Sequence, residues 1–233
     1  MKLKNLNWTA FLCMFTLILG LAIATPAKAS DAEYWSTYSV DAKVTERLKL
    51  KFVEQLRIND GKGFYTNVIY AGPVYKLTDR FSAGVLYKNV QKKGSSKEDW
   101  HTENGLVLDL YSKANLQDLS YFFPDINWWD IDYAGRNRLE YNAKGTWLYR
   151  AKSTVSKDFE LAGRNYTPYV ANETFINLND KFRFEQDRAE AGVKTDFFFG
   201  TTIKVYYMAR LKKQHDGKWT NANILGTTIS YKF

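Results

Sequence analysis

The sequence predicts an all-β fold, an antiparallel transmembrane β-barrel that follows an export signal. Apolar and polar residues alternate along many segments of about ten residues each. Aromatic residues make up 16% of the chain and stand mostly near the ends of these segments. The chain opens with a basic and then apolar stretch, and its last residue is Phe233. Together these observations are typical of an exported barrel protein.

The first 29 residues are predicted to be a secretory signal peptide. A basic start is followed by an apolar run from Trp8 to Ala24, and small residues stand at Ala27 and Ala29. A charged start, an apolar stretch and an A-x-A site are the parts of such a peptide, so we expect cleavage after Ala29. The alternative, a membrane-anchoring helix, would need a longer apolar run. Residues 30–233 then form one barrel domain, which lacks cysteine because Cys13 is the only one in the chain.

Eleven segments of the mature chain have the alternation of β-strands. The clearest is 48–58, where Leu50 and Phe52 fall on one face and Lys49 and Lys51 on the other. Turn-forming residues separate the segments, as in Asn59-Asp-Gly and Asn142-Ala-Lys-Gly. The predicted strands are 34–43, 48–58, 65–75, 81–89, 102–112, 135–142, 146–155, 168–178, 182–194, 201–212 and 221–233.

The strand lengths favour a membrane barrel over a soluble sandwich. Soluble strands usually have about five or six residues, whereas a tilted strand that crosses a bilayer needs about ten. Only a closed barrel satisfies the backbone of such strands inside lipid. A periplasmic β-sandwich or a soluble β-barrel is the alternative, because polar faces rich in long charged residues also fit a surface exposed to water.

The C-terminal strand indicates the compartment and the assembly route. Ile229, Tyr231 and Phe233 lie on one face of the last segment. This pattern resembles the last-strand signal of bacterial outer-membrane proteins, which the barrel-assembly machinery recognises. We therefore expect export through the periplasm of a Gram-negative bacterium into the outer membrane, with the barrel-assembly machinery and outer-membrane lipid as partners.

The number of strands is predicted from the even counts of single-chain bacterial barrels. Eleven candidates would then require one more strand, placed between Ala114 and Tyr133, which gives about 12 strands. Merging two candidates would give ten instead.

Basic residues on the inferred inward faces form the candidate site. Rings of Arg and Lys inside a pore select anions, and arginine binds carboxylates with two parallel hydrogen bonds. Small anionic solutes or acidic oligosaccharides are the solutes that such a lumen favours. The alternative is a structural network in which Glu54, Glu140, Glu173, Glu185 and Glu190 neutralise these cations. The set is Lys49, Lys51, Arg57, Arg136, Arg138, Arg150, Lys152, Arg183, Lys204, Arg210 and Lys212, with Arg188 added if a bulge follows Phe184.

Several segments resemble the DUF2490 family. The resemblance is carried by Tyr169-Val-Ala-Asn-Glu-Thr-Phe175, by Phe184-Glu-Gln-Asp-Arg188 and by the closing aromatic strand, and it extends over essentially the whole mature chain. Proteins of this family are predicted outer-membrane β-barrels with no established activity, so the resemblance implies a fold and leaves the function open. A weaker likeness to oligogalacturonate-specific porins rests on size and the basic lumen, without a shared motif.

No convincing catalytic constellation is visible in the sequence. The two histidines, His101 and His215, do not stand in a pattern with a serine, and two histidines without cysteine do not predict a metal site. We expect no cofactor and no nucleic-acid partner. Three functions follow: a narrow porin-like channel for small anions, a closed structural or binding barrel that acts through its loops, and a lipid-acting outer-membrane enzyme that uses one of the histidines.

Overall fold

The structure is a computed structural model that describes residues 32–61, 63–94, 99–116, 131–214 and 216–233. The predicted signal peptide and its cleavage site at Ala27 and Ala29 lie outside these residues. The chain forms one sheet of twelve strands: β1 (Ala32–Lys43), β2 (Leu48–Asn59), β3 (Gly63–Lys76), β4 (Phe81–Lys93), β5 (Trp100–Asn115), β6 (Asp132–Asn142), β7 (Trp147–Ser156), β8 (Phe159–Leu161), β9 (Arg164–Asn177), β10 (Arg183–Asp196), β11 (Thr201–Lys213) and β12 (Trp219–Lys232).

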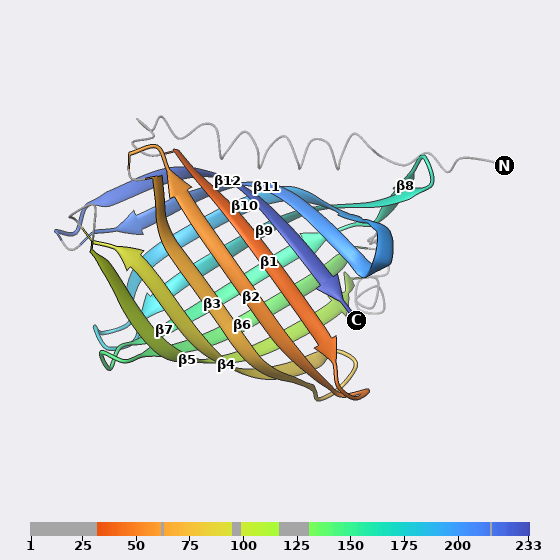
Figure 1. The fold of residues 1–233 in the computed structure, drawn as a ribbon, viewed down its shortest axis with the longest axis horizontal. Helices are drawn as coiled ribbons and strands as arrows, with labels where there is room; N and C mark the ends of the chain where they lie inside the picture. Colours follow the sequence, from red (N-terminus) through yellow and green to blue (C-terminus); the bar gives the residue numbers. More distant parts are fainter. Residues whose placement is uncertain (1–31, 62, 95–98, 117–130, 215) are drawn as a thin grey trace.

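Eleven of these strands close into a barrel, shown in Figure 1. Successive barrel strands pair antiparallel, and the barrel closes where β1 pairs with β12. That last pairing is parallel and runs from Ala32 opposite Asn223 to Asp41 opposite Lys232. The short strand β8 pairs with β9 alone and projects beyond the barrel wall. Among the described residues, no helix is long and apolar enough to cross a membrane.

The predicted all-β barrel is confirmed, and each of the eleven predicted segments is a barrel strand. The expectation of an even number of barrel strands is wrong. An odd number closes here because the first and last strands run in the same direction. The twelfth strand of the sheet is β8, which lies outside the closed ring. The position proposed for a further strand, between Ala114 and Tyr133, falls largely in residues 117–130, outside the described residues.

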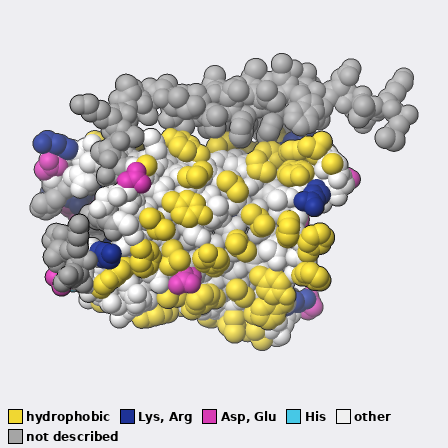
Figure 2. Space-filling model, turned by 45° about the horizontal axis from the view of Figure 1, so that its top comes forward, with side chains coloured by type: hydrophobic (Ala, Val, Ile, Leu, Met, Phe, Trp, Pro, Cys, Tyr) yellow, Lys and Arg dark blue, Asp and Glu magenta, His cyan; other side chains and the backbone are white. Residues whose placement is uncertain are grey.

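The outer face of the barrel is largely apolar, and the interior holds buried charged side chains beside apolar clusters. Leu225 and Val205 face outward and are 55% and 50% exposed, whereas Arg138 and Glu173 face inward and are 3% and 4% exposed. Figure 2 shows hydrophobic side chains spread over the wall, with most of the charged ones toward its two ends. The alternation seen in the sequence therefore sorts residues by face, as a period of two requires.

Exposed aromatic side chains gather near both ends of the strands. We call these the Trp219 end, where β12 begins, and the Phe233 end, where the chain finishes. At the Trp219 end three ring pairs have centroids 4.7–5.4 Å apart: Tyr141–Trp147, Phe64–Trp100 and Phe184–Trp219. The Phe233 end carries exposed Tyr75, Phe81, Phe197, Phe198, Tyr231 and Phe233.

Parts of the interior are packed as a core. One cluster surrounds Trp35 and Ile224, which are 1% and 0% exposed, and a second contains Leu86 and Val107. Gly226 allows the packing of the first cluster, because a Cβ atom there would collide with the ring of Tyr206. Side chains thus fill much of the barrel's cross-section.

Candidate functional site

A cavity of about 330 Å³ lies inside the barrel, and eight of its 21 lining residues are basic. The inward positions of β2, β6, β7, β10 and β11 supply the cations, because every second residue of a strand points into the lumen. Two carboxylates, Glu173 and Glu190, also line the cavity. The cationic lining residues are Lys51, Arg57, Arg136, Arg138, Arg150, Lys152, Arg188 and Lys204.

Eight of the twelve basic residues in the predicted cluster therefore meet around one cavity, and four lie elsewhere. Lys49 pairs with Asp41 at the Phe233 end. Arg210 pairs with Glu33, with 2.7 Å between Nη2 and Oε1. Arg183 is part-exposed beside the turn before β10, where it pairs with Asp180 and Glu185, and Lys212 follows two positions after Arg210 on β11.

Glu173 is shared by three arginines. Its carboxylate accepts hydrogen bonds from Arg136 at 2.6 Å, Arg150 at 2.8 Å and Arg188 at 3.3 Å. Arg188 reaches this position because β10 has a register shift between Phe184 and Gln186, the bulge that the sequence analysis required. One negative charge thus serves three guanidinium groups in a buried setting.

Glu190 binds two of the three lysines that line the cavity. Lys152 and Lys204 donate to it at 2.9 and 2.8 Å, and the Tyr169 hydroxyl donates as well.

Arg138 is neutralised by another carboxylate, through two parallel hydrogen bonds of 2.6 and 2.7 Å to Asp109. This bidentate geometry is the one that arginine and carboxylate favour.

A continuous chain of contacts crosses the lumen, and we call it the lumen layer: Lys88, Glu140, Arg150, Glu173, Arg188, Trp35 and Arg57. Glu140 binds Lys88 and Arg150, and Arg150 binds Glu173. Arg188 joins Glu173 to the ring of Trp35, with 4.9 Å from its guanidinium carbon to the ring centroid. Arg57 lies over the same ring at 4.0 Å. Because these residues come from seven strands, they tie opposite walls of the barrel together.

Glu33 holds Trp35 in this layer. Its carboxylate accepts hydrogen bonds from the indole Nε1 at 2.8 Å and from the Tyr65 hydroxyl at 2.8 Å, in addition to the pair with Arg210. The indole therefore has a fixed orientation across the lumen.

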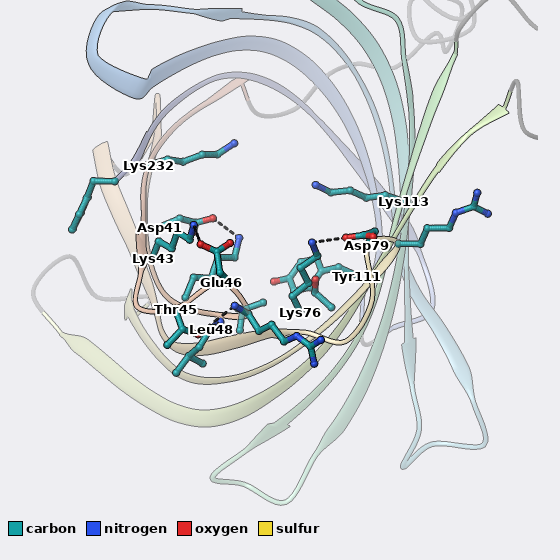
Figure 3. A pocket seen from close by; sticks show the side chains of 16 residues that line it. Asp41, Lys43, Thr45, Glu46, Leu48, Lys76, Asp79, Tyr111, Lys113 and Lys232 are labelled. Carbon is teal, nitrogen blue, oxygen red and sulfur yellow. Dashed lines mark hydrogen bonds and ion pairs between the residues drawn. The ribbon is translucent and has the colours of Figure 1, made fainter.

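A second cavity of about 560 Å³ forms the mouth of the barrel at the Phe233 end (Figure 3). Lys113 and Lys232 extend toward each other from opposite walls. In the turn after β3, a hydrogen bond from Lys76 lowers the pKa of Asp79, and in the turn after β1 a hydrogen bond from Lys43 lowers the pKa of Glu46. Both carboxylates thus stay ionised while cations dominate the mouth.

One acidic residue predicted for the lumen faces outward, and further charged residues of the lumen were not predicted. Glu54 was expected in the lumen, but it stands between Phe52 and Leu56 on the outward face of β2 and accepts a hydrogen bond from Asn67. Asp109 was overlooked, although its place between the outward-facing Leu108 and Leu110 is a signal for an inward acid. Glu33 and Lys88 were also overlooked.

Only one of the two histidines belongs to the described residues. His101 is exposed near the start of β5, and His215 lies outside the described residues. No group of three or more His, Cys, Asp or Glu side chains is arranged to hold a metal ion in the part of the chain that the structure describes.

Comparison with known protein families matches residues 32–221 to the family described as "Protein of unknown function (DUF2490)". This match extends over β1 to β11 and the start of β12, and so includes the lumen layer and all eight cationic residues that line the cavity. No curated protein and no solved structure matches the chain.

Proposed function

Since the chain belongs to the DUF2490 family of proteins of unknown function, we propose that it is an outer-membrane β-barrel that takes small anionic solutes into its basic lumen. The single observation that carries the proposal is the inversion of the barrel faces. Large apolar side chains are exposed on the outside, and charged side chains are buried inside. A soluble barrel gains stability from the opposite arrangement, whereas a lipid bilayer favours this one.

The spacing of the aromatic residues supports a bilayer as the surrounding medium. Trp219 and Tyr231 face outward on β12, twelve residues apart. At a rise of about 3.3 Å per residue and a tilt of about 40°, they lie about 30 Å apart along the barrel axis. An apolar band of roughly that height between aromatic girdles is typical of outer-membrane barrels.

The charge of the lumen supports anions as solutes. Cations outnumber carboxylates both at the mouth and around the inner cavity. Solutes that enter at the Phe233 end would meet Lys113 and Lys232 first and then the arginines around Glu173. Such a series of cations lowers the energy of an anion and repels a cation.

The lumen layer restricts passage beyond the cavity. Trp35 is 1% exposed and is flanked by Arg57 and Arg188, so a solute has to displace packed groups to move on. This layer favours a second candidate function, a closed barrel that binds its solute without conducting it. Both candidates share the basic cavity and differ in whether the layer opens.

Single-channel recording distinguishes the two candidates. The refolded protein would be inserted into a planar bilayer under a salt gradient, beside Trp35→Ala and the outer-face control Trp219→Ala. We expect small anion-selective steps from the unmodified protein and from Trp219→Ala, and larger steps from Trp35→Ala because the indole no longer spans the layer. The Trp35→Ala change should also cost about 3–5 kcal/mol of unfolding free energy, measured with denaturant.

The recordings have two informative alternatives. Silence from the folded, inserted protein together with steps from Trp35→Ala would favour the closed binding barrel. Cation selectivity, or failure of the folded protein to insert into lipid, would contradict the proposed function.

A further inference from the structure

The inner cavity carries more positive charge than its own carboxylates neutralise. Eight cations line it, against Glu173 and Glu190. Three carboxylates outside the lining also bind these cations: Asp41 binds Lys51, Asp109 binds Arg138, and Glu140 binds Arg138 and Arg150. Eight cations therefore share five carboxylates, which leaves at least three positive charges without a counter-charge among the described residues. The excess is larger still because Lys49 and Lys88 draw on Asp41 and Glu140 as well.

Hydrogen-bond donors at the cavity are also unused. The Nε atoms of Arg136 and Arg150 are buried and have no hydrogen-bond partner among the described residues. Both side chains line the cavity, and Arg150 is 92% buried, with a relative exposure of 8%. A buried guanidinium N–H group without an acceptor is unfavourable, so such a group points to a missing oxygen atom.

Arg57 is the cation with the least compensation. Its guanidinium donates two hydrogen bonds, both to the side-chain oxygen of Gln55, and it lies over the ring of Trp35. No carboxylate among the described residues forms an ion pair with it at 4.0 Å or less. A neutral amide and an aromatic ring offset only part of a buried positive charge.

We propose that the inner cavity binds a small oxyanion with two or more negative charges, held by Arg57 and by the arginines that share Glu173. The proposal deepens the proposed function and rests on it, because it names the class of solute that the lumen takes up. Arginine donates pairs of hydrogen bonds to phosphate and carboxylate oxygens alike, so inorganic phosphate and a short dicarboxylate share the required chemistry. A volume of about 330 Å³ has room for an ion of that size.

The test uses the folded protein in detergent micelles and isothermal titration with sodium phosphate, with sodium chloride at equal ionic strength as the reference titration. Arg57→Gln removes the least compensated cation, and Lys218→Gln removes an exposed one, with 83% of its side chain accessible, as the matched control. We expect phosphate binding by the unmodified protein and by Lys218→Gln. Arg57→Gln should bind about tenfold more weakly, because charge-assisted hydrogen bonds are lost.

Thermal unfolding keeps the proposal testable if Arg57→Gln binds nothing. Without phosphate this variant should unfold at the same temperature as the unmodified protein or higher, since an uncompensated charge is gone. Phosphate should raise the unfolding temperature of the unmodified protein and of Lys218→Gln more than that of Arg57→Gln. A lower unfolding temperature of Arg57→Gln in phosphate-free buffer would assign Arg57 a purely structural role and overturn the proposal.

A second titration, with succinate, distinguishes phosphate from dicarboxylate as the preferred ligand. If both ions bind and both depend on Arg57, the cavity is a general oxyanion site. If only one of them binds, that ion identifies the class of ligand. Equal heats for phosphate, succinate and chloride would overturn the inference. Anion-selective currents without phosphate binding would overturn this inference but not the proposed function. Phosphate binding in micelles by a protein that does not insert into lipid would contradict the proposed function alone.

Discussion

Glu54 is a carboxylate on an otherwise largely apolar stretch of the outer wall. It stands between Phe52, which is 42% exposed, and Leu56, and its only described hydrogen bond comes from Asn67. A charged group at this position is unfavourable in lipid and favourable in water. The residue therefore reports which medium surrounds the barrel.

Glu54→Leu is expected to raise the unfolding free energy in lipid vesicles by about 1 kcal/mol, because a carboxylate leaves the apolar phase. Denaturant titration in vesicles measures the change. Glu103→Leu is the control, since Glu103 is near the Trp219 end and pairs with the exposed Lys144, and it should change stability little. Unchanged or reduced stability of Glu54→Leu would argue against lipid at this face.

At the scale of single residues, the sequence pattern indicated which face of its strand a cationic side chain occupies, but not which carboxylate it binds. Eight predicted inward cations do meet at the cavity, because alternation assigns each of them to a face. Their counter-charges were only partly foreseen. Arg138 binds Asp109, 29 positions away, and Arg210 binds Glu33, 177 positions away. Such pairs depend on strand neighbours that local pattern does not reveal.

The seam between β1 and β12 is the element on which closure depends. Its ten aligned residue pairs are parallel, whereas the other barrel pairings are antiparallel. An odd number of strands makes this unavoidable, since successive hairpins reverse direction. Both strands alternate between outward and inward residues, so the seam buries the Trp35 cluster as the other pairings bury theirs.

A cysteine pair tests the seam. Ser36 lies opposite Thr227, and the described residues contain no cysteine, so Ser36→Cys with Thr227→Cys should form a disulfide on oxidation. Electrophoresis of the folded, oxidised protein without reductant detects it. Ser36→Cys with Asn221→Cys is the control, because Asn221 is six residues away along β12, or about 20 Å. Cross-linking of the control pair at the same rate would contradict the parallel register.

At the scale of the whole molecule, two belts of exposed aromatic side chains frame a wall of aliphatic ones. Trp100, Trp147 and Trp219 all belong to the belt at the Trp219 end, while Trp35 lies inside the lumen. Tryptophan in outer-membrane barrels prefers the boundary between headgroups and acyl chains. The belt therefore predicts the depth at which the barrel sits in a bilayer.

Fluorescence quenching by brominated lipids tests that depth. Bromine near the headgroups should quench tryptophan emission more strongly than bromine at the ends of the acyl chains. The triple variant Trp100→Phe, Trp147→Phe and Trp219→Phe should lose most of this difference, because the other tryptophan among the described residues, Trp35, is buried inside the lumen. Equal quenching at both depths would show that the belt does not lie at a membrane boundary.

Alternation along the chain was sufficient to predict the all-β barrel, its eleven wall strands and the basic character of the lumen, because side-chain direction in a strand depends only on position along it. The prediction that Arg188 faces inward required a bulge after Phe184, and the structure contains that bulge. The odd closure, the lumen layer around Trp35 and the excess of cations over carboxylates in one cavity emerged only from the tertiary structure. Each of them depends on which distant strands become neighbours, and closing the sheet is what decides that.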